Sequence, residues 1–211
     1  MWSYDLKSIR ELISYFQNKK IGGYIMRMNT KRLVLNSLLL ALGLLLHQLT
    51  PALGLAIQPD VALAMLFTIM ILNKDDYKSC LVAGIVIGIF TAMTTKFPGG
   101  QIPNIVDKII TTNIIFIVMY IFYKLSTIKK LKEDKQHLII AAIIFPMGTL
   151  ISGVIFLLSA NILVGLPGTF TALFIVAILP AILINSLVGV FLYKIVNLSV
   201  KRGNYYIKNI K

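Results

Sequence analysis

The sequence predicts an all-α integral membrane protein with six transmembrane helices and both termini in the cytoplasm. Hydrophobic residues make up 57% of the 211-residue chain and charged residues only 14%, against about 25% charged residues in soluble domains. Long apolar runs alternate with short lysine-rich segments. Such runs are helical in a bilayer, because no water is there to hydrogen-bond the backbone groups.

Six apolar stretches are expected to form these helices. They cover residues 33–50, 61–72, 81–95, 105–125, 138–160 and 170–196. The second and third are shorter than the roughly 20 residues that a span needs, so length alone leaves half-crossings open. Charge favours six full crossings, since all 21 Lys and Arg residues except Lys96 and Lys108 then fall on one side. By the positive-inside rule that side is the cytoplasm, which predicts a multi-pass protein of the cell membrane.

The expected domain organisation is an N-terminal extension (1–27), a six-helix membrane domain (28–200) and a basic cytoplasmic tail (201–211). Two interpretations of the extension stay open. Its apolar residues between 9 and 16 have the spacing of an interfacial helix. Alternatively, translation starts at Met26 or Met28, because residues 21–23 can be encoded by a ribosome-binding sequence.

Small residues four positions apart are expected to bring helices into close contact. The pairs are Ser37 and Ala41, Gly84 and Gly88, and Gly148 and Ser152. Pro146 and Pro180 fall inside predicted helices, where each removes a hydrogen bond and is expected to kink the helix. The single cysteine, Cys80, excludes an intrachain disulfide or a multi-cysteine metal site within the chain, and we interpret it as a packing residue.

Charged residues at membrane depth indicate function, because each costs about 2.5–3.5 kcal/mol on insertion scales. Asp60 and Asp107 are the only acids on the predicted outer side, where Lys96 and Lys108 also lie. One interpretation is purely local: the acids favour helix starts, Lys108 snorkels outward and Lys96 is a solvated loop end. The other is an outward-facing pocket for a small zwitterion. In that pocket acids would bind the ammonium, lysines and helix-start amides the carboxylate, and Phe97 a ring.

A polar stripe runs along the start of the fourth apolar stretch. Its members, related by spacings of three and four residues, are Asn104, Asp107, Lys108, Thr111 and Thr112. Asp107 and Lys108 are neighbours about 100° apart on a helix, so both cannot point straight at one ligand. One of them is expected to hold a neighbouring helix.

The candidate substrate site combines this stripe with nearby outer residues. Its members are His47, Asp60, Lys96, Phe97, Gln101, Asn104, Asp107 and Lys108. His47 is a ligand, a proton-coupling group or a packed, hydrogen-bonded histidine. Asn185, in the sixth stretch, lines the pocket or hydrogen-bonds across helices. The glycine- and proline-containing segments 98–100 and 159–169 are lids over the pocket or tight turns.

The run TTKFPGGQIPNIVDK at 94–108 carries a resemblance to a known family, together with HQLTP at 47–51, QPD at 58–60 and LVGLPGTFTALF at 163–174. Over residues 28–201 the chain closely resembles the tryptophan transporter family. That family is related to the substrate-binding S components of energy-coupling factor (ECF) vitamin transporters. The resemblance implies a six-helix S-component-like bundle that takes up tryptophan from the outer side.

The same resemblance implies possible partners. S components work with a membrane coupling subunit and two cytoplasmic ATPases, and a small-residue motif on the first helix often docks the coupling subunit. Ser37 and Ala41 are the nearest match, although serine replaces the usual alanine and leucines surround the pair. The chain has no Walker motif, so any ATP hydrolysis would come from partners.

Other function classes fit the sequence less well than tryptophan uptake. An enzyme is disfavoured, because the only histidines, His47 and His137, fall on opposite predicted sides and no HExxH motif is present. We expect no cofactor, no metal and no nucleic acid; the lysines instead suit lipid headgroups. A solitary ion-coupled carrier of another small zwitterion or vitamin remains an alternative, as does a non-catalytic structural membrane subunit.

Overall fold

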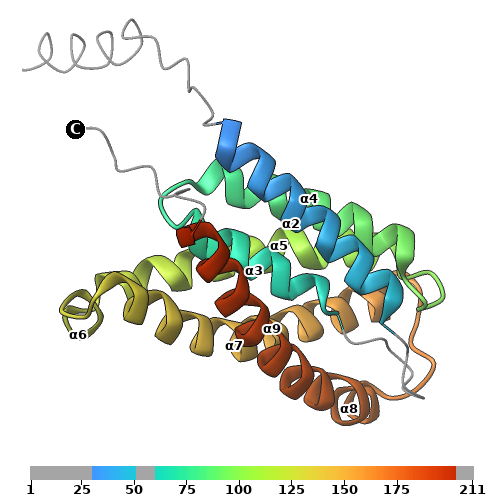
Figure 1. Ribbon diagram of the computed structural model, residues 1–211. Helices are drawn as coiled ribbons and strands as arrows, with labels where there is room; N and C mark the ends of the chain where they lie inside the picture. The colour runs from blue at the N-terminus through green and yellow to red at the C-terminus, as the bar shows by residue number, and fades with distance from the viewer. Residues whose placement is uncertain (1–29, 51–59, 203–211) are drawn as a thin grey trace, which may run out of the picture. The chain divides into compact units, whose positions relative to one another are not determined.

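The computed structural model describes residues 30–50 and 60–202, and every regular element among them is a helix (Figure 1). The elements are α2 (Thr30–Leu49), α3 (Ala62–Leu72), α4 (Tyr77–Thr94), α5 (Gln101–Lys124), α6 (Ser126–Lys129), α7 (Glu133–Leu163), α8 (Phe170–Leu173), the π-helical turn η1 (Phe174–Ile178) and α9 (Leu179–Arg202). The predicted N-terminal extension (1–27), the alternative start Met28 and the tail beyond Arg202 lie outside the described residues.

Five of the described helical stretches are long and apolar enough to cross a membrane: α2, α4, α5, α7 and the continuous run Phe170–Arg202. Large apolar side chains such as Leu183, Leu187 and Phe191 are exposed on their surfaces. Exposed apolar surface of this extent suits contact with lipid rather than water. The predicted all-helical, multi-pass protein of the cell membrane is therefore confirmed.

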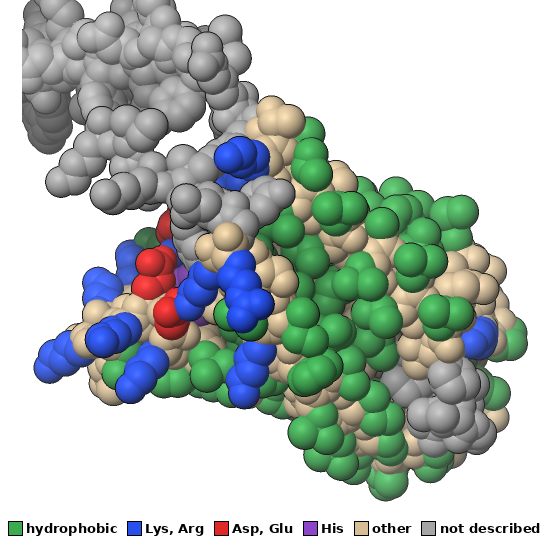
Figure 2. Space-filling model, viewed as in Figure 1, with side chains coloured by type: hydrophobic (Ala, Val, Ile, Leu, Met, Phe, Trp, Pro, Cys, Tyr) green, Lys and Arg blue, Asp and Glu red, His purple; other side chains and the backbone are tan. Residues whose placement is uncertain are grey.

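Charged side chains gather at one end of the molecule, over α6 and the start of α7, while apolar side chains cover much of the remaining visible surface (Figure 2). Five lysines in and around this segment account for part of the gathering: Lys124, Lys129, Lys130, Lys132 and Lys135. In the predicted topology this is the cytoplasmic end, and we call the opposite end, where α3 and α5 begin, the outer end.

Helix α3 is the exception in length. Its 11 residues give a helix of about 16 Å, about half the hydrocarbon thickness of a bilayer. Every residue from Ala62 to Ile71 is buried, and α3 contacts α4, α7 and α9. A helix enclosed by protein need not match the bilayer, so the short second stretch is a central core helix rather than a half-crossing exposed to lipid.

The position of α3 along the bundle leaves space at the outer end. At its other end, Asn73 Nδ2 donates to Asn36 Oδ1 at 3.0 Å, and Lys74 Nζ lies 3.4 Å from Glu133 Oε1 at the first residue of α7. Just before its start, Asp60 meets Lys108, which is about two turns into α5. Helix α3 therefore does not fill the space between its own start and the outer end of the bundle.

Two of the three small-residue pairs pack as predicted. A Cβ at Gly84 would overlap the Thr112 side chain, and one at Gly88 would lie 3.3 Å from Lys108 Cβ, so α4 and α5 approach closely. Gly148 packs on Phe67 in the same way, and its partner residue Ser152 hydrogen-bonds Asp107 across to α5.

For the pair Ser37 and Ala41, intramolecular packing is not observed, because both residues are exposed. The face of α2 that is buried instead carries Leu39, Gly43 and His47 at spacings of four residues. Small residues on the opposite face are left to contact lipid or another protein.

The two prolines sit in different surroundings. Pro146 lies inside the continuous helix α7, whereas Pro180 is the second residue of α9, just after the π-helical turn η1. A π turn widens a helix by one residue and is often found at functional sites. Ala177 and Ile178, on this widened turn, are buried.

Gly189 tests how tightly α9 and α7 are packed. A Cβ there would overlap the ring of Phe145, which is completely buried. We expect Gly189→Ala to lower the melting temperature by several degrees, because overpacking costs about 1–3 kcal/mol. Unfolding can be followed in detergent with a thiol-reactive fluorophore, since the single cysteine, Cys80, is buried.

The matched control for this prediction is Gly168→Ala, where an added Cβ meets nothing within 4 Å. An unchanged melting temperature for both variants would show that α7 and α9 are packed more loosely than described.

Candidate functional site

A pocket lies at the outer end, above the start of α3, with walls from α5, α7, η1 and α9. All predicted site residues except Gln101 line it: His47, Asp60, Lys96, Phe97, Asn104, Asp107 and Lys108. Gln101 is the first residue of α5, one turn nearer the outer end than Asn104, and is exposed. The sequence motif and the pocket thus coincide over most of the site.

The centre of the pocket holds three charged side chains, Asp60, Asp107 and Lys108, which we call the ionic cluster. Lys108 Nζ lies 2.6 Å from Asp60 Oδ2 and also hydrogen-bonds Asp107 Oδ2. The interpretation that Lys108 snorkels outward is wrong, because its side chain is only 2% exposed. Its long stem instead folds back to reach both carboxylates.

Asp107 and Lys108, the adjacent charged residues of the polar stripe, both bind another part of the chain, whereas only one of them was expected to do so. Asp107 accepts a hydrogen bond from Ser152 Oγ of α7 at 2.8 Å, and Lys108 reaches Asp60 just before α3. The cluster therefore ties α5, α7 and the start of α3 together where they surround the pocket.

The two carboxylates differ in how fully they are paired. Asp107 Oδ1 accepts from Thr111 Oγ1 at 2.8 Å, and Oδ2 accepts from Lys108 and Ser152. Asp60 Oδ2 pairs with Lys108, but Asp60 Oδ1 has no hydrogen-bond partner among the described residues. With Asp60 and Asp107 ionised, one lysine leaves a net negative charge in the cluster. A cationic group of a ligand would restore neutrality, and Asp60 Oδ1 is the acceptor available to it.

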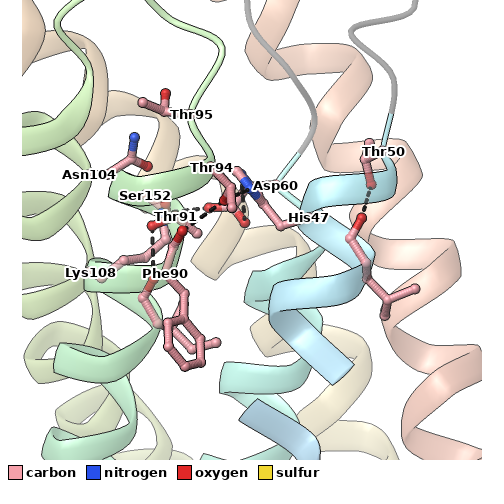
Figure 3. Close-up of polar contacts among 12 residues, drawn as sticks. His47, Thr50, Asp60, Phe90, Thr91, Thr94, Thr95, Asn104, Lys108 and Ser152 are labelled. Atoms are coloured by element: carbon pink, nitrogen blue, oxygen red, sulfur yellow. Dashed lines mark hydrogen bonds and ion pairs between the residues drawn. The ribbon is translucent and has the colours of Figure 1, made fainter. Parts of the chain in front are cut away.

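His47 is placed by α2 beside this cluster (Figure 3). Its Nδ1 lies 2.7 Å from Thr94 Oγ1, and its Nε2 lies 3.9 Å from Asp60 Oδ1. The ring is buried. These contacts match the packed, hydrogen-bonded histidine among the interpretations above, while leaving the ring on the pocket wall.

The segment between α4 and α5 forms the pocket rim. Lys96 is exposed, and its Nζ donates to the backbone carbonyl of Thr50 at 2.7 Å. Asn104 Nδ2 donates to the carbonyl of Gly100 at 2.8 Å. Gly99 has φ +72°, a conformation that side chains with a Cβ rarely adopt, so glycine is needed for this turn.

Aromatic and aliphatic side chains complete the walls. The rings of Phe97 and Phe156 meet edge to face, with centroids 5.4 Å apart and planes at 82°. Leu157, Ala177 and Ile178 also line the pocket and are buried. Apolar walls around a few polar groups are typical of small-molecule sites.

Part of the site was not predicted. Thr149, Ser152 and Phe156 of α7 line the pocket, as does Ile178 of η1. The sequence predicts close packing for the small pair Gly148 and Ser152. Polar residues within that apolar stretch are the only signal in the sequence for this wall of the pocket. Asn185 lines the pocket, in agreement with one of its two interpretations.

Comparisons with known proteins agree with the motif. Residues 29–201 match the family described as "Tryptophan transporter TrpP". A "Probable tryptophan transport protein" of Clostridium perfringens (strain 13 / Type A) is 49% identical, covering 84% of this chain and 97% of the relative. Proteins of the same description from Clostridium acetobutylicum and Bacillus subtilis (strain 168) are 49% and 38% identical, covering 83% and 84% of this chain and 97% of each relative.

No solved protein structure matches the chain significantly. The family match covers most of the membrane domain, and it includes every predicted site residue. The chain belongs to the TrpP family of tryptophan transporters.

Proposed function

We propose that this chain takes up tryptophan across the cell membrane and binds it in the outer pocket. The observation that carries the proposal is the ionic cluster between apolar walls, in which one lysine faces two carboxylates and Asp60 Oδ1 has no hydrogen-bond partner among the described residues. The substrate comes from the family description and from the names of the relatives. Membership in a transporter family favours transport over catalysis.

The pocket offers a partner to each part of the amino acid. The ammonium group binds Asp60 Oδ1, where it restores charge balance. The carboxylate faces Lys96 at the rim. The ammonium group of Lys96 has three N–H donors, and one of them donates to the backbone carbonyl of Thr50. The aromatic ring lies between the apolar walls, and Phe97 closes over the substrate on the outer side.

Access to the pocket is proposed to depend on the segment 98–100, which precedes α5 and contains the left-handed Gly99. The segment 159–169 is a second proposed lid, where Gly165 has φ +87°. Opening of these segments would admit substrate from outside, and closure would exclude water before release to the cytoplasm.

The proposal includes an S-component-like role with a membrane coupling subunit and two ATPases. What supports it is that Ser37 and Ala41 are exposed on α2 within the part of the chain that the structure describes. Among the described residues, no group of three or more potential metal ligands lies together, and the proposal invokes no metal or cofactor.

Uptake and binding assays test the function. Cells that lack their own tryptophan uptake should accumulate radiolabelled tryptophan when they produce this chain. The purified protein should bind tryptophan saturably, with little competition from tyrosine, phenylalanine or riboflavin. Folded protein that binds no tryptophan, in cells that take up none, would contradict the proposal.

The energy source is tested by reconstitution of the chain alone in liposomes. Uptake driven by an ion gradient would identify a solitary carrier. Binding without uptake would support dependence on partners, and addition of a coupling subunit with its ATPases should then restore transport.

A further inference from the structure

The deep end of the pocket carries two polar side chains, Asn185 of α9 and Thr149 of α7, which we call the pocket floor. Both line the pocket, and they are only 1% and 3% exposed. Helix α7 runs toward the outer end and α9 runs away from it. Thr149 is therefore the deepest pocket residue of α7, and Asn185 is the deepest of α9.

The polar atoms of the floor have no hydrogen-bond partner among the described residues: Asn185 Oδ1, Asn185 Nδ2 and Thr149 Oγ1. Buried polar groups are otherwise almost always paired, and an unpaired amide or hydroxyl is unfavourable by at least about 1 kcal/mol. At membrane depth the protein gains nothing from such groups unless something else pairs with them.

Similar residues elsewhere in the bundle pair with their own helix. The side chains of Asn73, Asn104 and Asn113 each donate to the carbonyl four residues earlier. Thr68, Thr91, Thr94 and Thr112 do the same with their hydroxyls. Asn185 and Thr149 are exceptions, and both face the pocket. Both residues thus contribute to the pocket polar groups that have no partner among the described residues.

The floor lies about one helical turn below the ionic cluster. Thr149 precedes Ser152, which hydrogen-bonds Asp107, by three residues on α7. On α9, Asn185 follows the pocket residue Ala181 by four residues. A turn of helix rises about 5.4 Å, comparable to the separation of the amino nitrogen and the indole nitrogen within tryptophan. At the level of the cluster, Gly153 packs against Ile178, and Ala181 contributes a small side chain to the pocket wall.

We propose that the pocket floor recognises the indole N–H of the substrate, with Asn185 Oδ1 as the acceptor and Thr149 beside it. This inference rests on the proposed function and adds the source of substrate selectivity. Indole has one ring donor and phenylalanine has none, so the floor would remain unpaired beneath a phenyl ring. Sites built to hydrogen-bond a ligand group reject analogues that lack it far more strongly than apolar pockets reject a missing methylene.

The test compares tryptophan with 3-(benzothiophen-3-yl)alanine, in which sulfur replaces the indole N–H while ring size and zwitterion stay the same. Wild-type protein should bind tryptophan about tenfold or more tighter than this analogue. Asn185→Leu, which keeps the number and branching of the side-chain heavy atoms, should reduce that ratio to about twofold or less. Thr149→Val is the second variant, and it should also reduce the ratio.

Stability provides an independent readout. Since Asn185 is unpaired in the substrate-free protein, Asn185→Leu should unfold at the same or a higher temperature. The matched control is Ser186→Ala, which removes an unpaired buried hydroxyl on the same helix that does not line the pocket. This control should leave the ligand ratio as in wild type.

Three outcomes would overturn the inference. One is equal wild-type affinity for the two ligands. Another is an unchanged ratio in both Asn185→Leu and Thr149→Val. The third is that Asn185→Leu loses affinity equally for both ligands but not for tryptamine, which lacks the carboxylate, because the floor would then bind the carboxylate. Folded wild-type protein that binds neither amino acid would instead contradict the proposed function, and the inference with it.

Discussion

Lys108→Met is expected to destabilise the protein by about 3–5 kcal/mol and to abolish tryptophan binding. Methionine can fill the space of the lysine stem, but it leaves Asp60 and Asp107 close together without a cation. Breaking a buried ion pair is far more harmful than replacing it entirely, because an uncompensated charge remains. The measurement is thermal unfolding in detergent, followed by a thiol-reactive fluorophore at the buried Cys80.

A second substitution separates loss of charge balance from loss of packing. Lys108→Met combined with Asp107→Asn removes one carboxylate together with the lysine, which leaves the same net charge as in wild type. We expect this double variant to recover part of the lost stability, because two carboxylates no longer repel each other although Asp60 still lacks its cation. If Lys108→Met unfolded at the wild-type temperature, the ionic cluster would not bind α3 and α5 together as described.

The sequence predicted the α5 side of the site because α5 is mostly apolar and its polar residues follow the helical period. Asn104, Asp107, Lys108, Thr111 and Thr112 are all buried on one face, as their spacing of three and four residues requires. With six membrane crossings, Asp60 also falls on the predicted outer side. This points to Asp60 independently of the helical period. Periodicity and topology together were therefore sufficient to bring Asp60 and Lys108 into one candidate site.

The opposite wall could not be predicted in this way. Helix α7 is 31 residues long, and its buried and lipid-facing sides are both apolar, so its sequence has little periodic contrast. Which face of it meets α5 depends on tertiary contacts such as Gly148 on Phe67. The same loss of contrast along α9 kept the two interpretations of Asn185 open.

The position of the pocket depends on the length of α3. The length of the second apolar stretch leaves a half-crossing open, and the distribution of Lys and Arg favours a full crossing. Neither predicts a helix that is enclosed by protein on all sides. Because α3 begins at Ala62, beside the ionic cluster rather than at the outer surface, the space above it is available for a substrate. The pairing of Lys108 with both acids also depends on this geometry, since the sequence shows only that the three residues share a side.

Asp60→Asn is expected to weaken tryptophan binding at least about thirtyfold while the protein stays folded. Of the two acids, Asp60 has the oxygen without a hydrogen-bond partner among the described residues, whereas both oxygens of Asp107 accept hydrogen bonds. In this variant Lys108 would still pair with Asp107. With both ionised, the cluster would be neutral and would no longer attract an ammonium group. Loss of one partner from a buried, hydrogen-bonded charge pair typically costs about 2–5 kcal/mol of binding free energy. The measurement is equilibrium binding of radiolabelled tryptophan to detergent-purified protein.

The ammonium group can be removed from the ligand instead of the acid from the protein. Asp60→Asn should not weaken binding of 3-indolepropionate, which lacks the ammonium but keeps the ring and the carboxylate. Asp107→Asn should lower the melting temperature more than Asp60→Asn, because Thr111, Ser152 and Lys108 all donate to Asp107. If Asp60→Asn bound tryptophan as wild type does and Asp107→Asn did not, the ammonium would lie at Asp107. The hydrogen bonds of Asp107 would then have to rearrange when substrate enters, which would make substrate binding and the packing of α5 on α7 a single coupled event.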